Sequence, residues 1–149
     1  METAVIEKIS NVARVKADYA KSSFLKCFVY SMFAGAYIGI GITLILTLGA
    51  QISGSEYTVG LTKLVMGASF GLALSMCIMC GSDLFTGNNL LMGVGAMTRR
   101  VSWLEAFHVW GINLIGNLAG SLLVAWIIKR SGLLKYEQFG AFVVTMSAD

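Results

Sequence analysis

Charged residues are scarce in this sequence. They make up 13% of its 149 residues, while 56% are hydrophobic and proline is absent. A soluble domain of this size carries about a quarter charged residues. The low share of charge therefore excludes an ordinary soluble domain and predicts an integral membrane protein. The formal net charge of +3 is modest and spread along the chain, which favours contact with anionic lipid headgroups over nucleic-acid binding.

Cysteine and histidine are also rare, with three and one in the chain. Cys77 and Cys80 have the spacing of a thiol or zinc pair, but no second Cys or His pair accompanies them. The pattern favours small apolar side chains in a helix interface. A membrane thiol oxidoreductase using Cys77 and Cys80 is a minor alternative. We expect no metal, cofactor or catalytic residue, and no enzyme. No signal peptide is expected, because residues 1–23 are polar or amphipathic and no cleavage site closes the next apolar run.

The longest apolar region, residues 64–98, has a polar cluster in its middle. Asp83 is its only formally charged residue, and the segment around it reads Gly81-Ser82-Asp83-Leu84-Phe85-Thr86-Gly87-Asn88-Asn89. A straight helix would place these groups against lipid, where each unsatisfied backbone group is costly. We therefore expect a helix that ends near Gly81 and resumes near Asn89. Irregular backbone at membrane depth lines a water-filled path or is buried in protein, so the break is the candidate permeation or binding site.

The remaining segments predict an N-terminal helix and two further spans. Residues 3–22 have the pattern of an amphipathic helix that lies on the membrane or packs against a neighbouring subunit. Its expected apolar face consists of Val5, Ile6, Ile9, Val12, Ala13 and Ala20. Residues 24–50 and 106–128 are long enough to span a bilayer, whereas residues 140–149 are too short. The last stretch predicts the start of a re-entrant segment or of a fourth helix.

Small and amide residues predict where the spans meet. Gly35 and Gly39, like Gly116 and Gly120, have the small-xxx-small spacing of close helix contacts. Asn113 and Asn117 share one helix face, and we expect them to form hydrogen-bonding clasps rather than direct substrate contacts. His108 is expected to anchor the third span at headgroup depth.

Positive charge predicts the orientation. Seven Lys and Arg residues lie in the N-terminal tail and in the loop between the second and third spans, against four on the other side. This bias favours a multi-pass protein of the inner or plasma membrane with a cytoplasmic N-terminus.

The segment from Gly81 to Asn88 resembles the formate/nitrite transporter family. Three further motifs agree in order, and together they cover nearly the whole chain: Ala34-Gly35-Ala36-Tyr37-Ile38-Gly39, Met66-Gly67-Ala68-Ser69-Phe70-Gly71 and Gly116-Asn117-Leu118-Ala119-Gly120-Ser121. The similarity is strongest to the nitrite-channel branch. It implies an all-α, aquaporin-like bundle of two inverted three-helix repeats, a homopentamer with a pore in each subunit, and transport of nitrite, formate or hydrosulfide together with a proton.

The resemblance also implies roles for individual residues. Leu84 and Phe85 match one hydrophobic constriction of the family's pore, and Phe70 and Leu74 match a second. Thr86 matches a hydroxyl in the pore loop, and the substrate path continues along Gly87 and Asn88. Asp83 matches a carboxylate position. We expect hydrogen bonds from loop amides to keep Asp83 off the path of the anion.

The family pattern is incomplete in this chain. The family's pore also needs a lysine after the third helix and a histidine on a broken fifth helix, but no lysine follows Lys135. Residues 1–23 are therefore interpreted as the N-terminal helix and residues 24–149 as the first of two repeats, with the second expected in the same natural chain or in a companion fragment. A poreless assembly subunit of the membrane is the alternative to a channel.

Overall fold

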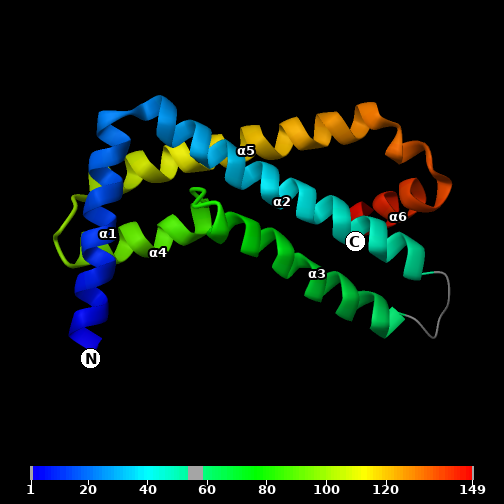
Figure 1. The fold of residues 1–149 in the computed structure, drawn as a ribbon, viewed down its shortest axis with the longest axis horizontal. Helices are drawn as coiled ribbons and strands as arrows, with labels where there is room; N and C mark the ends of the chain where they lie inside the picture. Colours follow the sequence, from blue (N-terminus) through cyan, green and yellow to red (C-terminus); the bar gives the residue numbers. More distant parts are fainter. Residues whose placement is uncertain (1, 54–58, 149) are drawn as a thin grey trace. The chain divides into compact units, whose positions relative to one another are not determined.

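The computed structural model describes residues 2–53 and 59–148, and these residues form helices joined by short connections (Figure 1). In chain order the elements are α1 (Glu2–Ser22), α2 (Phe24–Ile52), α3 (Val59–Met79), α4 (Phe85–Met97), α5 (Trp103–Ser131), η2 (Leu133–Lys135) and α6 (Glu137–Ala148). No strand occurs within the described ranges. The predicted all-α fold is confirmed.

Among the residues that the structure describes, three helices are long and apolar enough to cross a membrane, as predicted: Phe24–Ile52, Gly60–Met79 and Trp103–Ser131. The first and third extend beyond the predicted bounds. The predicted connection over residues 51–63 is shorter than expected, and residues 54–58 lie outside the described part of the chain. Residues 137–148 form the helix α6, which begins before the expected segment.

The chain forms two compact units. The first comprises residues 1–35 and 81–120, and the second comprises residues 36–80 and 121–149. The first unit therefore contains α1, α4, the beginning of α2 and most of α5. The second contains the rest of α2 and α5 together with α3, η2 and α6. The helix break belongs to the first unit.

In the first unit α1 packs along α4 (Figure 1). Of the predicted apolar face of α1, Ala13 and Ala20 are buried in the chain, whereas Val5, Ile6 and Val12 are exposed. The face of α1 that packs within the chain consists of small residues: Ser10, Ala13, Ala17 and Ala20. A Cβ added at Gly95 of α4 would lie 2.5 Å from the Ala13 Cβ, so the two helices approach too closely for larger side chains.

The polar side of α1 is tied to the start of α5. Arg14 forms an ion pair with Asp18 on its own helix and a second one, at 3.1 Å, with Glu105. The hydrogen bond from Arg14 lowers the pKa of Asp18 below its ordinary value. The helix predicted to lie on the membrane or on a neighbouring subunit therefore contacts its own chain.

In the second unit α2 packs closely against α3 and α6. A Cβ added at Gly41 would lie 2.3 Å from the Ala73 Cβ of α3, and one added at Gly49 would lie 2.7 Å from the Phe142 ring of α6. These contacts place α6 against α2.

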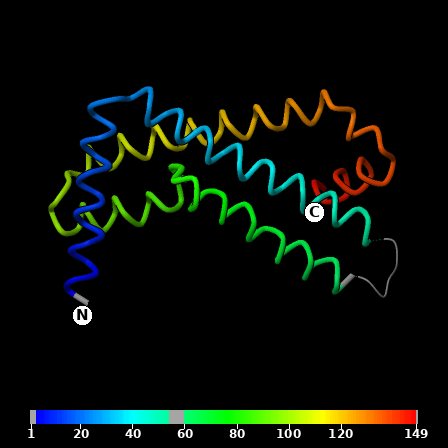
Figure 2. Tube along the Cα trace, viewed as in Figure 1, coloured from blue at the N-terminus to red at the C-terminus, as the bar shows by residue number. Residues whose placement is uncertain are grey.

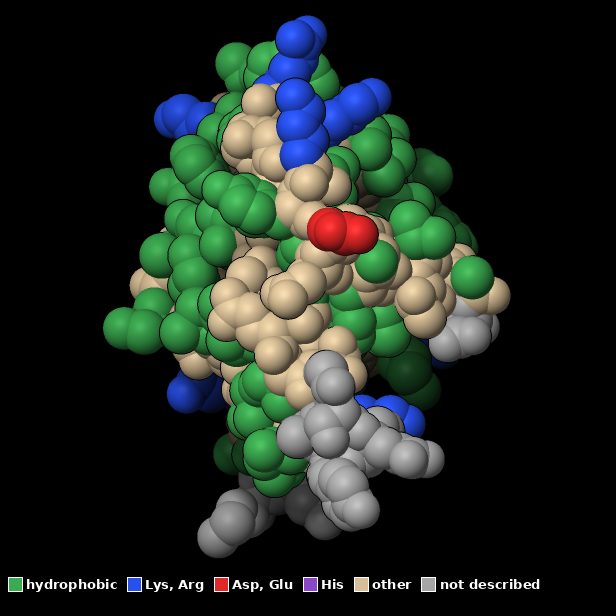
Figure 3. Space-filling model, turned by 90° about the vertical axis from the view of Figure 1, so that its right-hand side faces the viewer, with side chains coloured by type: hydrophobic (Ala, Val, Ile, Leu, Met, Phe, Trp, Pro, Cys, Tyr) green, Lys and Arg blue, Asp and Glu red, His purple; other side chains and the backbone are tan. Residues whose placement is uncertain are grey.

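Few residues of the three spans are buried within the chain. Only 22%, 17% and 28% of the residues in their most apolar windows are buried. Figure 3 shows one face of the molecule, with hydrophobic side chains over much of it. Exposed apolar surface over such lengths is typical of helices that face lipid or other protein.

Candidate functional site at the helix break

The helix break is confirmed, and its bounds are tighter than predicted. α3 ends at Met79 and α4 begins at Phe85, not near Asn89. Gly81 adopts a φ of +65°, a left-handed conformation that glycine enters without steric penalty. Leu84 is extended, with φ −78° and ψ 129°, and its side chain does not cap the helix. Phe85, Thr86, Gly87 and Asn88 therefore lie in the first turn of α4.

Asn117 of α5 holds the break in place. Its Oδ1 accepts a hydrogen bond from the Phe85 N–H at 2.9 Å. Its Nδ2 donates to the Asp83 carbonyl at 3.0 Å and to the Ser31 carbonyl of α2 at 2.9 Å. One amide thus satisfies a backbone group on each side of Leu84 and connects the break to α2. The prediction of a hydrogen-bonding clasp is confirmed for Asn117.

Asn113 forms a second clasp one turn earlier on α5. Its side chain is fully buried, and its Oδ1 lies 2.7 Å from the Ser31 hydroxyl. The same hydroxyl lies 2.9 Å from the Cys27 carbonyl. The Asn113 Nδ2 has no hydrogen-bond partner. The contact with Ser31 therefore joins α2 to α5, as predicted, while half of the amide stays unsatisfied.

The Asp83 carboxylate is held by an amide of the predicted break and also by a lysine that the sequence analysis did not connect with it. Its carboxylate forms an ion pair with Lys16 of α1 and accepts a hydrogen bond from Asn88 Nδ2 at 3.3 Å. The residue is only 9% exposed. Its backbone N–H points to the Tyr30 carbonyl of α2 at 3.4 Å. Burial and pairing together hold this charge away from solvent.

Asn88 is fixed by a further contact, because its carbonyl accepts a hydrogen bond from the Trp110 indole at 3.2 Å. The Trp110 ring in turn packs edge-on against Phe107, with ring centroids 5.2 Å apart. Asn88 is buried at 3% exposure. It therefore supports the break from within the protein, and its place on the substrate path stays a prediction.

The other predicted site residues are divided between the two units. Leu84 and Phe85 are half-buried in the first unit, and Thr86 and Gly87 are exposed there. Phe70 and Leu74 lie one turn apart on α3 in the second unit. The structure thus brings together the break residues with Asp83 and Asn88, while Phe70 and Leu74 form a separate pair.

The start of α4 is suited to an anion. The N–H groups of Thr86 and Gly87 lie in its first turn, where no carbonyl of the helix can accept them. Helix N-termini carry a partial positive charge that attracts anions. The Thr86 hydroxyl adds a donor on the same exposed turn. The pairing of Asp83 with Lys16 lessens the opposing charge nearby.

Lys16 is the residue that sequence reasoning missed. The sequence assigned it to the polar face of an amphipathic helix, and that pattern carries no sign of a distant partner. The structure places it on the loop carboxylate, 67 positions away in the chain. A single buried carboxylate in an apolar region needs a partner cation. The isolated position of Asp83 was therefore the one feature of the sequence that pointed to a partner such as Lys16.

Gly35 allows α2 to approach α5 at the clasp. A Cβ added there would lie 1.9 Å from the Asn117 carbonyl oxygen, so any larger residue must separate the two helices. We expect Gly35→Ala to lower the melting temperature of the purified protein by about 5 °C or more. Gly111→Ala is the matched control, because a Cβ at Gly111 meets no atom within 4 Å. Equal melting temperatures for the two variants would contradict this contact.

Cys77 and Cys80 lie at the end of α3, and His108 lies near the start of α5. Cys77 is buried and Cys80 exposed, and neither forms a disulfide bond. No group of three or more His, Cys, Asp or Glu that could bind a metal occurs among the described residues. His108 is exposed near the start of α5, where the sequence predicted an interfacial anchor.

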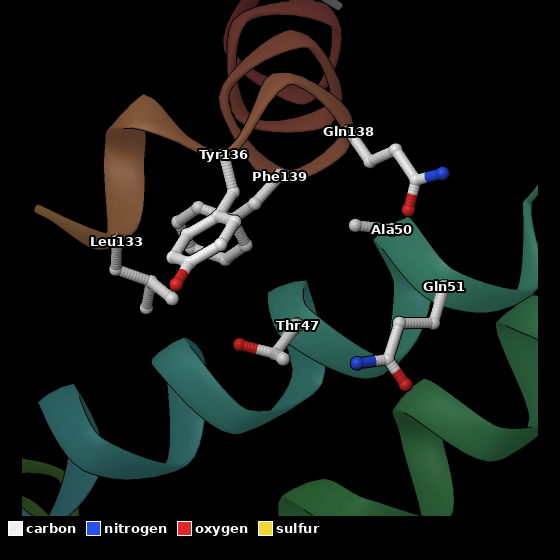
Figure 4. A pocket seen from close by; sticks show the side chains of 7 residues that line it. All are labelled: Thr47, Ala50, Gln51, Leu133, Tyr136, Gln138 and Phe139. Carbon is white, nitrogen blue, oxygen red and sulfur yellow. The ribbon is translucent and has the colours of Figure 1, made fainter.

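A separate cavity of about 240 Å³ lies in the second unit, between the end of α2 and the start of α6. Figure 4 shows the residues that line it, with Thr47, Ala50 and Gln51 on α2 and with Gln138 and Phe139 on α6. The side chains that line this cavity carry amide, hydroxyl or apolar groups, and none of them is charged. It contains none of the predicted site residues.

Comparisons with known proteins match nearly the whole chain. A family model described as formate/nitrite transporter matches residues 3–149. The nitrite transporter NirC of Salmonella typhimurium is 38% identical over 133 residues, which cover 89% of this chain and 47% of that protein. The formate channel FocA of Escherichia coli is 34% identical over 108 residues, which cover 72% of this chain and 37% of that protein.

A solved structure described as an FNT family ion channel is similar in fold as well as in sequence. It superposes with a TM-score of 0.78 at 35% identity and covers 87% of this chain and 50% of that one. The chain thus spans about half the length, or less, of these relatives.

Proposed function

The chain belongs to the formate/nitrite transporter family, and from this premise we propose that it contributes the first repeat of a membrane channel or transporter for small monovalent anions. Nitrite and formate are the proposed substrates, because the named relatives are a nitrite transporter and a formate channel. Hydrosulfide shares their charge and small size and is included in the proposal.

The geometry of the helix break is the observation that carries this proposal. An exposed hydroxyl and two N–H groups at the start of α4 form a compact set of donors for an anion. Asp83, which would repel an anion, is buried and paired. Leu84 and Phe85 flank these donors with apolar surface, as a constriction that excludes hydrated ions would.

In the proposed mechanism the anion enters as a charged species and crosses the apolar constrictions as a neutral acid. A bare charge in an apolar ring is strongly unfavourable, whereas a weak acid escapes this barrier once it takes up a proton. Leu84 and Phe85 would form one constriction, and Phe70 and Leu74 the other. The Thr86 hydroxyl and the first turn of α4 would bind the anion before and after it is protonated.

The proposed assembly extends beyond the described residues. We infer a second repeat that completes the pore, because the relatives are about twice as long as the matched region. We also infer a homopentamer in the inner or plasma membrane, with the N-terminus in the cytoplasm. The exposed apolar faces of the spans and the uneven distribution of Lys and Arg support these inferences.

Flux through liposomes tests the proposal. The protein encoded by the natural reading frame would be purified, its mass and oligomeric state determined, and reconstituted beside empty vesicles. We expect swelling or internal pH changes with nitrite and formate gradients, and none with sulfate. A folded, reconstituted protein without flux would favour the poreless assembly subunit. Retained flux after replacing Cys77 and Cys80 by serine would exclude a thiol-based activity as its source.

Thr86→Val tests the donor at the break. Valine keeps the shape of threonine and removes its hydroxyl, so we expect anion flux to fall about tenfold at equal protein content, a loss typical of one hydrogen bond to a charged group. The melting temperature should stay within about 2 °C. Thr145→Val on α6, which lies in the other unit, is the matched control. Parent-like flux in Thr86→Val would limit this residue to a structural role.

A further inference from the structure

The chain turns back between α4 and α5 (Figure 2), and this turn contains a residue other than glycine with a positive φ. The Arg99 N–H donates to the Ala96 carbonyl at 3.1 Å, and the Arg100 N–H donates to the Gly95 carbonyl at 2.9 Å. These two bonds define a Schellman motif, in which glycine usually occupies the left-handed position. Here Arg99 occupies it, with a φ of +59°, the one positive φ outside glycine in the described chain. Glycine would adopt this backbone conformation without steric cost. The side chain of Arg99 is therefore a better explanation of the residue at this position than the backbone.

The charges around the turn leave Arg99 without a protein partner. Arg14 and Lys21 both pair with Glu105. Glu105 also accepts the Ser102 N–H at 2.7 Å, while its own N–H donates to the Ser102 hydroxyl at 3.2 Å. In this capping box the side chains of Ser102 and Glu105 accept two of the free N–H groups at the start of α5. No ion pair or side-chain hydrogen bond reaches the Arg99 guanidinium from any residue that the structure describes.

Arg100 is only weakly engaged and lies beside Arg99. Its nearest carboxylate is Glu7, at the 4.0 Å limit of an ion pair, and the two side chains are 54% and 66% exposed. An exposed pair at that distance contributes little. Two adjacent guanidinium groups therefore remain available at the surface of the turn.

The turn borders a depression of about 670 Å³ that is lined by both charged and apolar residues. Its charged lining residues are Arg14, Arg99, Arg100 and Glu105, and Met97 and Trp103 form its exposed apolar rim. Met97 is 77% exposed and Trp103 53% exposed, and Leu104 beside it is 81% exposed. Trp103 is also the first residue of a candidate membrane span, which places the turn at the depth of lipid headgroups.

We propose that this turn binds the phosphate of an anionic phospholipid. Arg99 and Arg100 donate to the phosphate oxygens, which guanidinium groups recognise in a bidentate manner. Trp103 lies at the level of the headgroup, and Met97 and Leu104 contact the upper acyl chains. The exposed apolar rim favours a lipid over free phosphate, because inorganic phosphate would leave that surface in water. The site lies in one compact unit and is independent of the proposed pore.

Lipid retention tests the proposal. The purified natural protein in detergent would be titrated with phosphatidylglycerol or phosphatidylcholine, and bound lipids would be counted by native mass spectrometry. We expect the parent to bind phosphatidylglycerol in preference to phosphatidylcholine. In Arg99→Gln/Arg100→Gln this preference should fall by about fivefold for each arginine removed. The matched control, Lys129→Gln/Arg130→Gln, removes a basic pair from the last turn of α5 and should change the preference less than twofold.

Two further measurements distinguish lipid binding from the binding of free phosphate and from a purely structural role of Arg99. Millimolar inorganic phosphate should not displace phosphatidylglycerol, and complete displacement would assign the site to free phosphate and overturn the proposal. Arg99→Gly should keep or raise the melting temperature, because glycine suits the positive φ, yet reduce phosphatidylglycerol retention about fivefold. Full retention of phosphatidylglycerol by Arg99→Gly would also overturn the proposal. So would an equal loss of lipid preference in Arg99→Gln/Arg100→Gln and in its control Lys129→Gln/Arg130→Gln.

Discussion

Replacing Asn117 with leucine should abolish most anion flux and destabilise the protein more than any other single change at the break. Leucine is close to asparagine in size but leaves three backbone groups without their partner: the Phe85 N–H and the Asp83 and Ser31 carbonyls. Each buried polar group left unpaired costs about 1–3 kcal/mol. We expect a loss of roughly 3 kcal/mol or more in stability and a fall in melting temperature of about 10 °C.

The effect on flux should exceed what lower stability explains. Without Asn117 the segment from Asp83 to Phe85 loses both of its bonds to α5, so the first turn of α4 is no longer held in position. We expect at least a tenfold loss of nitrite or formate flux in vesicles that contain equal amounts of folded protein, since about 1.4 kcal/mol of lost positioning corresponds to a factor of ten.

Asn89→Leu provides the matched control for this prediction. Asn89 follows Asn88 in the first part of α4 and is half-buried, but none of the hydrogen bonds that hold the break involves it. Its replacement should leave the melting temperature within about 2 °C. If Asn117→Leu and Asn89→Leu had the same melting temperature and the same flux, the clasp would not determine the geometry of the break.

The break and the clasps could be predicted because residue type alone signals them. A carboxylate, two asparagines and two glycines within an apolar region have no stable place in a straight membrane helix. Asn113 and Asn117, on one face of the next span, were predicted to form hydrogen-bonding clasps between helices. The positions of the break, of Asn117 and of the three spans therefore followed from local pattern and length.

The bounds of the break could not be predicted, because they depend on a tertiary contact. Phe85-Thr86-Gly87-Asn88 contains glycine and polar residues and has the composition of a loop. In the structure Asn117 accepts the Phe85 N–H, which satisfies the first free donor and lets α4 begin four residues earlier than expected. A partner 32 positions away is not visible in local propensity.

Contact of α1 with its own chain could not be predicted for a related reason. The predicted apolar face combined Val5, Ile6 and Val12 with Ala13 and Ala20, yet contact with Gly95 requires small residues at the interface. Interhelical contacts of membrane proteins are made by small side chains at close range. Where two helices approach this closely, size rather than hydrophobicity decides which residues are buried.

The ion pair between Lys16 and Asp83 gives the second large effect that we expect. Lys16→Met would leave the Asp83 carboxylate with only the Asn88 amide as a side-chain partner. Breaking a fully buried pair costs about 3–5 kcal/mol. The Lys16 side chain is 28% exposed and that of Asp83 12%, so screening by solvent should reduce the loss to about 1–2 kcal/mol.

The loss of flux in Lys16→Met should be electrostatic in origin. An unpaired carboxylate two residues before α4 would oppose the partial positive charge at the start of that helix and repel the incoming anion. We expect roughly a tenfold lower flux. Asp83→Asn removes the negative charge instead, so it should lower stability without a comparable loss of flux.

The double variant Lys16→Met/Asp83→Asn distinguishes charge from structure. It removes both charges, and its flux should recover to within about threefold of the parent, although each single change is destabilising. Lys8→Met, an exposed lysine on the same helix, is the control for the loss of one positive charge and should behave like the parent. A double variant with the low flux of Lys16→Met would show that Lys16 acts by holding α1 in place rather than by neutralising Asp83. The contact between α1 and the break would then be a structural support alone, and the charge of Asp83 would not reach the path of the anion.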